Sequence, residues 1–532
     1  MTQSTQPAVP PCLRQQGSAT QLIVAGQPFL VLGGEVHNSS SSSLDYMQPI
    51  WDRLVAFNIN TVLVPVSWEL LEPEEGRFDF TLVDGLIRYA SLYGLHLILL
   101  WFGSWKNGTS SYAPLWVKRD TRRFPRAELQ GGQPVEVLST FSAANQQADA
   151  AAFAALMRRV REVDGDAHTV IMVQVENEVG LLGDGRDRSA AAEHAFAQPV
   201  PPEFITHLRQ SAIDPGLRQR WESGGSRDQG AWQQVFGDGP QVDELFMAWH
   251  YARYIDAVTA AGKAEYDIPM YVNAWLNGAG QKPGDWPSGG PLPHVFDAWR
   301  AGASHIDLLA PDIYQLNFQE WCQAYARGGN PLFIPETLRE GDGPRNVFYA
   351  LGEGNAIGFS PFAVDSLDPA GGAALRRSYD LLQQLAPLIL ERQGTGALAG
   401  FALDPQQPMT IRHMGGYELE ISLDQNFGHQ GTEGCGLIMA LGEDEFIGAG
   451  YGFRVCFRPT TPGPGLAGIA AVDEGQYDQG QWVAGRRLNG DETSGGSYWR
   501  FPVFELAERR VDAYLLSAGT GISRCRVYRY ER

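Results

Sequence analysis

One stretch of this 532-residue chain limits its possible structure more than any other, the run from His168 to Gly180, HTVIMVQVENEVG. Residues 169–175 are mostly apolar and β-branched, a pattern typical of a buried strand. The strand ends in Glu176, Asn177 and Glu178. Desolvating a carboxylate is costly, so acids at the end of an apolar strand indicate a polar cavity in which their pKa values matter. The simpler alternative is a strand that merely surfaces into a charged loop.

Strand-like and helix-like segments alternate over roughly the first 390 residues. Strands are predicted over 27–34, 60–68, 95–102, 169–176, 268–275, 305–312, 331–335 and 356–362. Helices are predicted over 44–57, 81–93, 143–163, 240–262, 293–302, 316–327, 344–353 and 369–386. This alternation favours a (β/α)8 TIM barrel over an open doubly wound sheet, and no glycine-rich phosphate-binding motif follows any strand.

The two ends of the chain differ from this central part. Residues 1–19 are rich in Gln, Ser and Pro, which predicts a loose N-terminal arm before a barrel over 20–392. Residues 393–532 are Gly-rich, with short alternating strands and no helical periodicity. This texture predicts a smaller C-terminal β-sandwich domain. That domain either packs against the barrel as a structural element or binds carbohydrate.

Charge and composition narrow the class of partner. The net charge is −20, from 41 basic and 61 acidic residues, and no basic run is present. We therefore expect no nucleic-acid partner and no membrane partner, but a neutral ligand such as a carbohydrate. The five cysteines are scattered without zinc or disulfide spacing, and no leader or spanning segment is apparent, so we expect a cytoplasmic protein. The oligomeric state is left open, a homo-oligomer included.

Acids and aromatic residues follow the predicted strands. In a TIM barrel the carboxyl ends of the strands meet on one face, where the chemistry occurs. Hydrolysis of a glycosidic bond needs two carboxyl groups, one protonated and one ionised. Glu178 and Glu336 are the best candidates, because each ends a short apolar strand. No His/Cys metal cluster and no Gly-x-Ser-x-Gly motif is present, so no metal and no cofactor are expected.

Two segments then carry a family resemblance. Val173 to Gly180, VQVENEVG, resembles the Q-x-E-N-E-x-G segment of glycoside hydrolase family 35, the β-galactosidases of the retaining (β/α)8 clan. Trp68 to Phe80, WELLEPEEGRFDF, is similar to that family's segment after strand two. The whole chain, C-terminal β-domain included, resembles a compact bacterial branch of the family.

The resemblance implies an activity and roles for individual residues. Glu178 would be the general acid/base, and Glu336 the nucleophile of a double-displacement mechanism. Asn177 would bind the sugar 2-hydroxyl, and Tyr314 would hydrogen-bond the nucleophile. The implied substrate is a terminal, non-reducing β-linked galactose of an oligosaccharide or glycoconjugate.

Further substrate contacts are expected from side chains at the strand ends, each weighed against an ordinary core or loop role. They are Glu35, Trp101, Lys106, Asn107 and Trp275. The segments after strands one and three depart from the family, with Ser104 near the position of a galactose-binding Glu. A β-glucosidase or a β-glucosyl transferase on the same barrel is therefore the alternative. Another class of alternative is a catalytically silent carbohydrate-binding protein.

The long segments after strands three and four, roughly 104–142 and 180–240, would wall the site and favour attack at a chain end.

Overall fold

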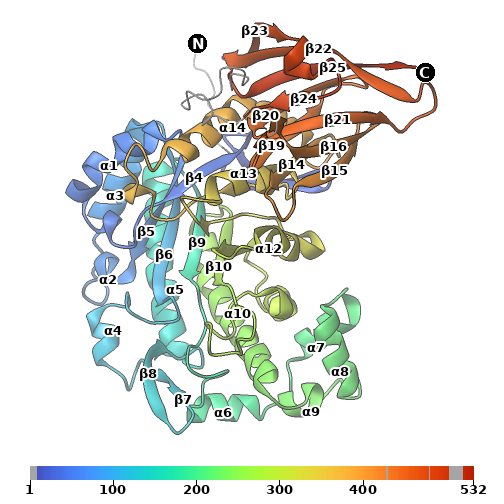
Figure 1. The fold of residues 1–532 in the computed structure, drawn as a ribbon. Coiled ribbons are helices and arrows are strands. Elements are labelled where there is room, and N and C mark those ends of the chain that lie inside the picture. Colours follow the sequence, from blue (N-terminus) through green and yellow to red (C-terminus); the bar gives the residue numbers. More distant parts are fainter. Residues whose placement is uncertain (1–8, 427–428, 479, 503–518, 532) are drawn as a thin grey trace, which may run out of the picture.

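The computed structural model describes residues 9–426, 429–478, 480–502 and 519–531. Eight parallel strands form one sheet in the order β12-β11-β10-β9-β6-β5-β4-β13. A parallel bridge between Ile334 and Phe359 joins the segment before β12 to β13, and this contact closes the ring. The predicted (β/α)8 barrel is therefore confirmed (Figure 1).

The barrel strands run close to the predicted ranges. They are β4 (Val31–Glu35), β5 (Thr61–Ser67), β6 (His96–Lys106), β9 (Val170–Asn177), β10 (Met270–Trp275), β11 (Leu308–Ile313), β12 (Glu336–Thr337) and β13 (Gly358–Phe359). The largest difference is at β12, where Ile334 alone of the predicted strand over 331–335 forms a bridge and the strand itself consists of Glu336 and Thr337.

Helices surround the barrel. The main ones are α1 (Leu44–Ala56), α3 (Thr81–Leu92), α5 (Ala143–Asp164), α10 (Pro240–Glu265), α11 (Phe296–Gly302), α12 (Phe318–Tyr325), α13 (Gly343–Gly352) and α14 (Ala373–Arg392). Short helices η1 (Ser40–Ser42), α2 (Trp68–Leu71), η2 (Pro293–Val295), η3 (Arg327–Gly329) and η4 (Val364–Ser366) complete the layer.

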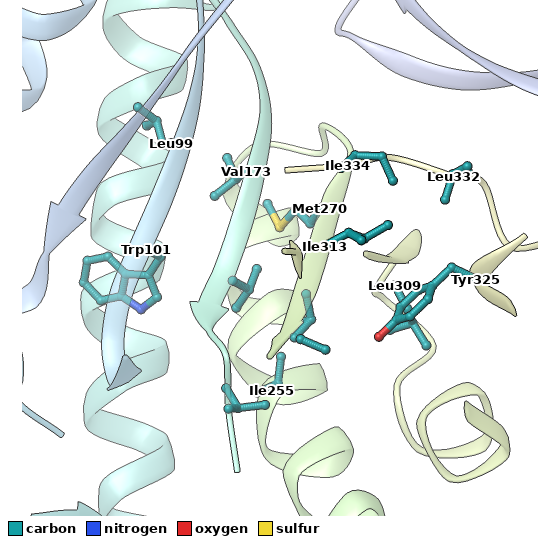
Figure 2. Close-up of a cluster of buried hydrophobic side chains, with 14 of the residues drawn as sticks. Leu99, Trp101, Val173, Ile255, Met270, Leu309, Ile313, Tyr325, Leu332 and Ile334 are labelled. Atoms are coloured by element: carbon teal, nitrogen blue, oxygen red, sulfur yellow. The ribbon is translucent and has the colours of Figure 1, made fainter. Parts of the chain in front are cut away.

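Strand alternation separates two apolar cores. Because successive side chains of a strand point to opposite faces, one set fills the barrel and the other meets the helices. In β6, Ile98 and Leu100 belong to the inner core, whereas Leu99 and Trp101 belong to the outer one. Figure 2 shows Leu99 and Trp101 on their strand among other residues of that outer core.

Two long insertions follow β6 and β9. The first contains α4 (Leu115–Arg119) and the hairpin of β7 (Arg126–Leu129) with β8 (Gln133–Leu138). The second contains α6 (Ala190–Phe196), α7 (Pro202–Gln210), α8 (Pro215–Ser223) and α9 (Trp232–Phe236). They lie at the carboxyl ends of the strands, far from the C-terminal domain (Figure 1).

The N-terminal segment differs from the prediction. Strand β1 (Cys12–Gln16) pairs with β2 (Ala19–Val24), which in turn pairs with β3 (Gln27–Phe29). Leu22 and Val24 are buried beside the inner core. The expected loose arm over 1–19 is therefore wrong for residues 12–16 and 19, while residues 1–8 lie outside the described part. A Gln-rich segment can still form a strand here, because the backbone of β1 pairs with β2, whose side chains are largely apolar and buried.

The C-terminal part is built of two antiparallel sheets. One has the order β14-β19-β20-β25-β22-β23 and the other β15-β16-β21-β24. Both contribute to one apolar core that includes Phe401, Leu419, Phe453 and Trp499, as expected for a sandwich. Helix α14 ends at Arg392 and β14 begins at Leu398.

The strands of this part are β14 (Leu398–Leu403), β15 (Met409–Met414), β16 (Tyr417–Leu423), β17 (Gln425–Asn426), β18 (His429–Gln430), β19 (Gly434–Ala440), β20 (Glu445–Tyr451), β21 (Phe453–Pro459), β22 (Leu466–Asp478), β23 (Gln481–Leu488), β24 (Trp499–Phe501) and β25 (Ile522–Tyr530). One short helix, η5 (Gly490–Thr493), precedes β24. Across the described residues, none of the helices combines the length and the apolar character needed to cross a bilayer.

Candidate active site

Three carboxyl groups meet at the carboxyl ends of β9, β11 and β12. They belong to Glu178, Asp312 and Glu336, and one oxygen of each lies within 4.8 Å of the others. We call these three residues the inner carboxyl cluster. Retaining glycosidases place their two carboxyl groups about 5 to 5.5 Å apart, whereas inverting enzymes need about 6.5 Å or more. The close approach of Glu178 and Glu336 fits the retaining arrangement.

The backbone at the end of β9 directs its two acids to different places. Glu176 and Glu178 both have positive φ, 63° and 44°, a conformation that costs energy for a residue with a Cβ. The Glu178 N–H donates to Asn273 Oδ1 at 2.9 Å, which stabilises the bend. Strand alternation predicts that Glu176 and Glu178 share a face, and this prediction is wrong because the strand leaves regular β geometry here.

Glu336 receives hydrogen bonds on both carboxylate oxygens. The Tyr314 hydroxyl donates to Oε2 at 2.9 Å, and Asn177 Nδ2 donates to Oε1 at 3.2 Å. Asn273 Nδ2 lies 3.4 Å from the same Oε1. Burial, followed by the charge of Glu336, raises the pKa of Tyr314, so its hydroxyl keeps the proton it donates. Donors directed at a carboxylate favour its ionised form.

Lys106 brings the positive charge of the site. Its ammonium donates to Asn177 Oδ1 at 2.9 Å and lies 5.1 Å from the centre of the Phe102 ring. Burial by itself would lower the pKa of Lys106, but the surrounding acids, Glu336 and Glu178 foremost, raise it above its ordinary value. The ammonium therefore stays charged and offsets part of the negative charge of the inner carboxyl cluster.

Glu178 has the protonation behaviour of a general acid. Burial first, and then the negative charge of Glu336, raise its pKa to about 7, while the charge of Lys106 acts in the opposite direction. A catalytic acid works best when its pKa lies near the operating pH. Glu178 and Glu336 remain 7% and 5% exposed, so a ligand can reach both.

Glu35, at the end of β4, is the most isolated acid of the site. It is fully buried, and neither carboxyl oxygen has a hydrogen-bond partner among the described residues. Burial raises its pKa well above the ordinary value, and the charge of Glu336 raises it further. Burial therefore disfavours the charged form of Glu35, and its hydrogen-bonding capacity is unused among the described residues.

Trp275 and Asn107 lie at the rim. Trp275 is 41% exposed at the end of β10, in register with Asp312 of β11. Asn107 is exposed with φ of 51°, and its N–H donates to the Asn177 carbonyl at 3.2 Å. The predicted residues other than Trp101 are therefore found at the carboxyl end of the barrel.

Trp101 is not at the site, and its predicted role in substrate binding is wrong. Its indole N–H donates to Asp149 Oδ1 at 2.9 Å, and its ring packs on Phe153 of α5. The side chain is fully buried on the outer face of β6. The register of β6 against β9 shifts between Trp101 and Lys106, and this irregularity brings Lys106 into the site.

Behind β9 lies a second group of acids, which we call the outer carboxyl cluster: Glu176 and Asp149. Glu176 accepts from the backbone N–H groups of Ser104 and Trp105 at 3.1 and 2.7 Å. Asp149 accepts from Trp101 and from the Ser104 hydroxyl. Burial raises the pKa of both acids, and the charge of Asp149 raises the pKa of Glu176 further. Ser104 therefore faces away from the site.

Asp312 was not among the residues selected from the sequence as catalytic or substrate-binding. It is 1% exposed, and its Oδ2 accepts from Asn273 Nδ2 at 2.7 Å. Its place at the end of a predicted strand, two residues before Tyr314, was the only available signal.

Three carboxylate oxygens this close can suit a cation. The buried ammonium of Lys106 already supplies positive charge there, so acid–base chemistry accounts better for the three carboxyl groups.

Comparison with known proteins gives two sequence matches to families. Residues 43–224 match the glycoside hydrolase family 42 model, described as beta-galactosidase. Residues 375–499 match a domain of unknown function, DUF5597. The first match includes Glu178 and ends before Glu336.

Among curated proteins, a beta-galactosidase of Xanthomonas manihotis is 31% identical over 172 residues, which is 31% of this chain and 26% of that protein. The chain thus spans about a quarter of that relative's length.

Among solved structures, the β-galactosidase of Rahnella sp. R3 superposes with a TM-score of 0.46 at 16% identity, over 68% of this chain and 57% of that one. The catalytic domain of the β-amylase of Paenibacillus polymyxa gives 0.45 at 12% identity, over 65% of this chain and 96% of that one. These superpositions add nothing to the barrel already described. The resemblance to family 35 is corrected by the sequence match: the β-galactosidase model that fits residues 43–224 is that of glycoside hydrolase family 42.

Proposed function

We propose that this protein is a retaining exo-glycosidase that hydrolyses terminal, non-reducing β-linked galactose from oligosaccharides or glycoconjugates. The observation that carries the proposal is the inner carboxyl cluster, in which Glu178 and Glu336 approach within 4.8 Å under opposite influences. Glu336 is surrounded by hydrogen-bond donors, whereas burial and the charge of Glu336 favour the protonated form of Glu178.

The proposed reaction starts with Glu336 ionised and Glu178 protonated. The Glu336 carboxylate attacks the anomeric carbon while Glu178 gives its proton to the departing glycosidic oxygen. A covalent glycosyl-enzyme results, and the aglycone leaves as an alcohol. Glu178, now ionised, takes a proton from water, whose oxygen attacks the anomeric carbon and releases both the sugar and Glu336. Tyr314 holds the nucleophile, and Asn177 reaches the sugar hydroxyl next to the anomeric carbon.

The remaining polar groups define a sugar-sized site. Lys106 and Glu35 supply donors and an acceptor from β6 and β4, and Asn107 and Trp275 lie at the rim. The insertions after β6 and β9 stand at this end of the barrel (Figure 1). They favour binding of a chain end over binding along a polymer.

A β-glucosidase, or a β-glucosyl transferase, is the second candidate, and one observation favours it. Ser104, near which the sequence suggested a galactose-binding contact, is held by Asp149 and Tyr254 outside the site. It therefore supplies no contact that would select galactose over glucose. A single misplaced hydrogen bond changes binding by about 1 to 3 kcal/mol.

The test is the initial rate of hydrolysis of matched nitrophenyl β-galactoside, β-glucoside, β-xyloside and β-fucoside, with Glu336→Gln as the blank. A dominant β-galactoside rate that the blank lacks supports the proposal. A dominant β-glucoside rate keeps the mechanism and reassigns the specificity. If no substrate reacts even with an alcohol acceptor present, but galactose or glucose protects the protein against unfolding, the chain is a carbohydrate-binding protein without chemistry.

A further inference from the structure

Asp312, the third member of the inner carboxyl cluster, has no role in the proposed mechanism. Asp312 lies close to both proposed catalytic acids and contacts Asn273, which also contacts both of them. Asn273 Nδ2 donates to Asp312 Oδ2 at 2.7 Å, while the side-chain oxygen of the same Asn273 accepts from the Glu178 N–H. Asp312 Oδ1 receives no hydrogen bond from any N–H or hydroxyl group of the described residues.

One oxygen of the Asp312 carboxyl group lies within 4.8 Å of oxygens of Glu178 and Glu336. Where buried carboxyl groups lie this close, their negative charges repel, and one of them is held in its protonated form. A protonated carboxyl group can donate a hydrogen bond to an ionised neighbour, which can only accept. The question is which residue holds the proton while Glu178 is ionised, as it is after each protonation of a leaving group.

The surroundings of Asp312 answer this question. Asp312 is 1% exposed, whereas Glu178 is 7% exposed, so ionisation costs more at Asp312. The charged or titratable groups that act on Asp312 and Glu178 come from every neighbouring element: Glu35 of β4, Lys106 of β6, Tyr271 of β10, Tyr314 after β11, Glu336 of β12 and Tyr325 of α12. Lys106 is the only cation among these groups.

We propose that Asp312 stays protonated in the working enzyme and donates its hydrogen bond to the Glu178 carboxylate, which makes it a positioning residue for the acid/base. This inference rests on the proposed role of Glu178. Burial, and next the charge of Glu336, raise the pKa of Asp312 well above its ordinary value, in agreement with a neutral acid. The donated bond stabilises Glu178 after it has given up its proton, and so makes Glu178 a stronger acid.

Two variants test the inference. Asp312→Asn keeps the shape of a protonated Asp312, since the amide oxygen can accept from Asn273 and the amide NH2 can donate to Glu178. Asp312→Leu removes the donor. The measurement is the pH dependence of kcat/KM on an aryl β-glycoside, with Asp149→Asn of the outer carboxyl cluster as a matched control for loss of a buried acid.

We expect the alkaline limb of Asp312→Asn and of Asp149→Asn to stay at the wild-type pH. The limb of Asp312→Leu should move to higher pH, because Glu178 loses a group that stabilises its ionised form. An alkaline limb that moves to lower pH in Asp312→Asn overturns the inference, since it would show that the amide replaced a negative charge.

A second readout does not depend on activity or on the folding of Asp312→Leu. The infrared difference spectrum between wild type and Asp312→Asn at neutral pH should show loss of a protonated carboxyl band. Loss of a carboxylate band alone would overturn the inference. If the wild type hydrolyses none of the glycosides, the proposed function fails, and the infrared result still decides the protonation of Asp312.

Discussion

Strand β9 separates two carboxyl clusters that are similar in composition and different in use. The outer carboxyl cluster is fully buried, and all four of its carboxyl oxygens accept a hydrogen bond from an N–H or hydroxyl group of the surrounding chain. The inner carboxyl cluster is slightly exposed, lies beside the Lys106 ammonium and includes an oxygen of Asp312 that receives no such bond.

The difference shows what a raised pKa does and does not indicate. Burial raises the pKa of acids in both clusters. Only in the inner cluster do access for a ligand, unused hydrogen-bonding capacity and a nearby cation accompany that shift. The outer cluster connects the end of β6 to β9 and α5. We therefore expect inner variants to lose rate and keep stability, and outer variants to do the reverse.

The largest effect is expected from Glu336→Gln. Removing a nucleophile typically costs about 10^3-fold or more in kcat. The melting temperature should change little, because Asn177 and Tyr314 can still reach the amide. Glu176→Gln is the matched control on the other side of β9. It should keep most of the rate and lose stability of about 1 to 3 kcal/mol, since the amide cannot accept from both Ser104 and Trp105. A Glu176→Gln protein that is stable but inactive would contradict a purely structural role for the outer carboxyl cluster.

Glu178→Ala should affect substrates unequally. Loss of a general acid typically costs about 10^2- to 10^4-fold, and an activated aryl leaving group needs little protonation. The variant should therefore hydrolyse alkyl glycosides far more slowly than the wild type, while dinitrophenyl glycosides lose much less in the glycosylation step. Single-turnover rates on both substrates give the comparison. Equal losses would contradict the assignment of Glu178 as the acid/base.

Trp101→Ala tests whether Trp101 is a core residue and not a sugar contact. Truncation of a buried Trp typically costs about 3 to 5 kcal/mol of stability, and here it also removes the indole donor of Asp149. The unfolding midpoint in urea should fall strongly, whereas KM of the folded fraction should not change. A rise in KM with unchanged stability would show that Trp101 contacts the substrate after all.

The smallest effect is a shift in pH dependence. Because Glu178 must be protonated, kcat/KM should fall as pH rises through the pKa of about 7. Lys106 lowers that pKa, so Lys106→Met should move the alkaline limb to higher pH, and it should also raise KM by removing a hydroxyl donor. Lys118, which lies near Glu69 and outside the cluster, offers a control in Lys118→Met. An unchanged limb in Lys106→Met would mean that the ammonium does not act on Glu178.

The sequence by itself determined the barrel and its principal acids. Apolar runs alternating with amphipathic segments can bury their surfaces only as strands surrounded by helices, and parallel strands bring their carboxyl ends to one face. Glu178 and Glu336 could therefore be predicted as the principal acids from the sequence alone.

Only the tertiary structure decided where individual side chains point. Trp101 faces α5, Glu176 turns outward at positive φ, and Lys106 enters the site through a register shift. These directions depend on local departures from regular strand geometry that leave no periodic signal in the sequence. Asp312 gained its place in the cluster from the parallel sheet, in which β9, β10, β11 and β12 are consecutive neighbours and bring Glu178, Asp312 and Glu336 together although these residues are far apart in the sequence.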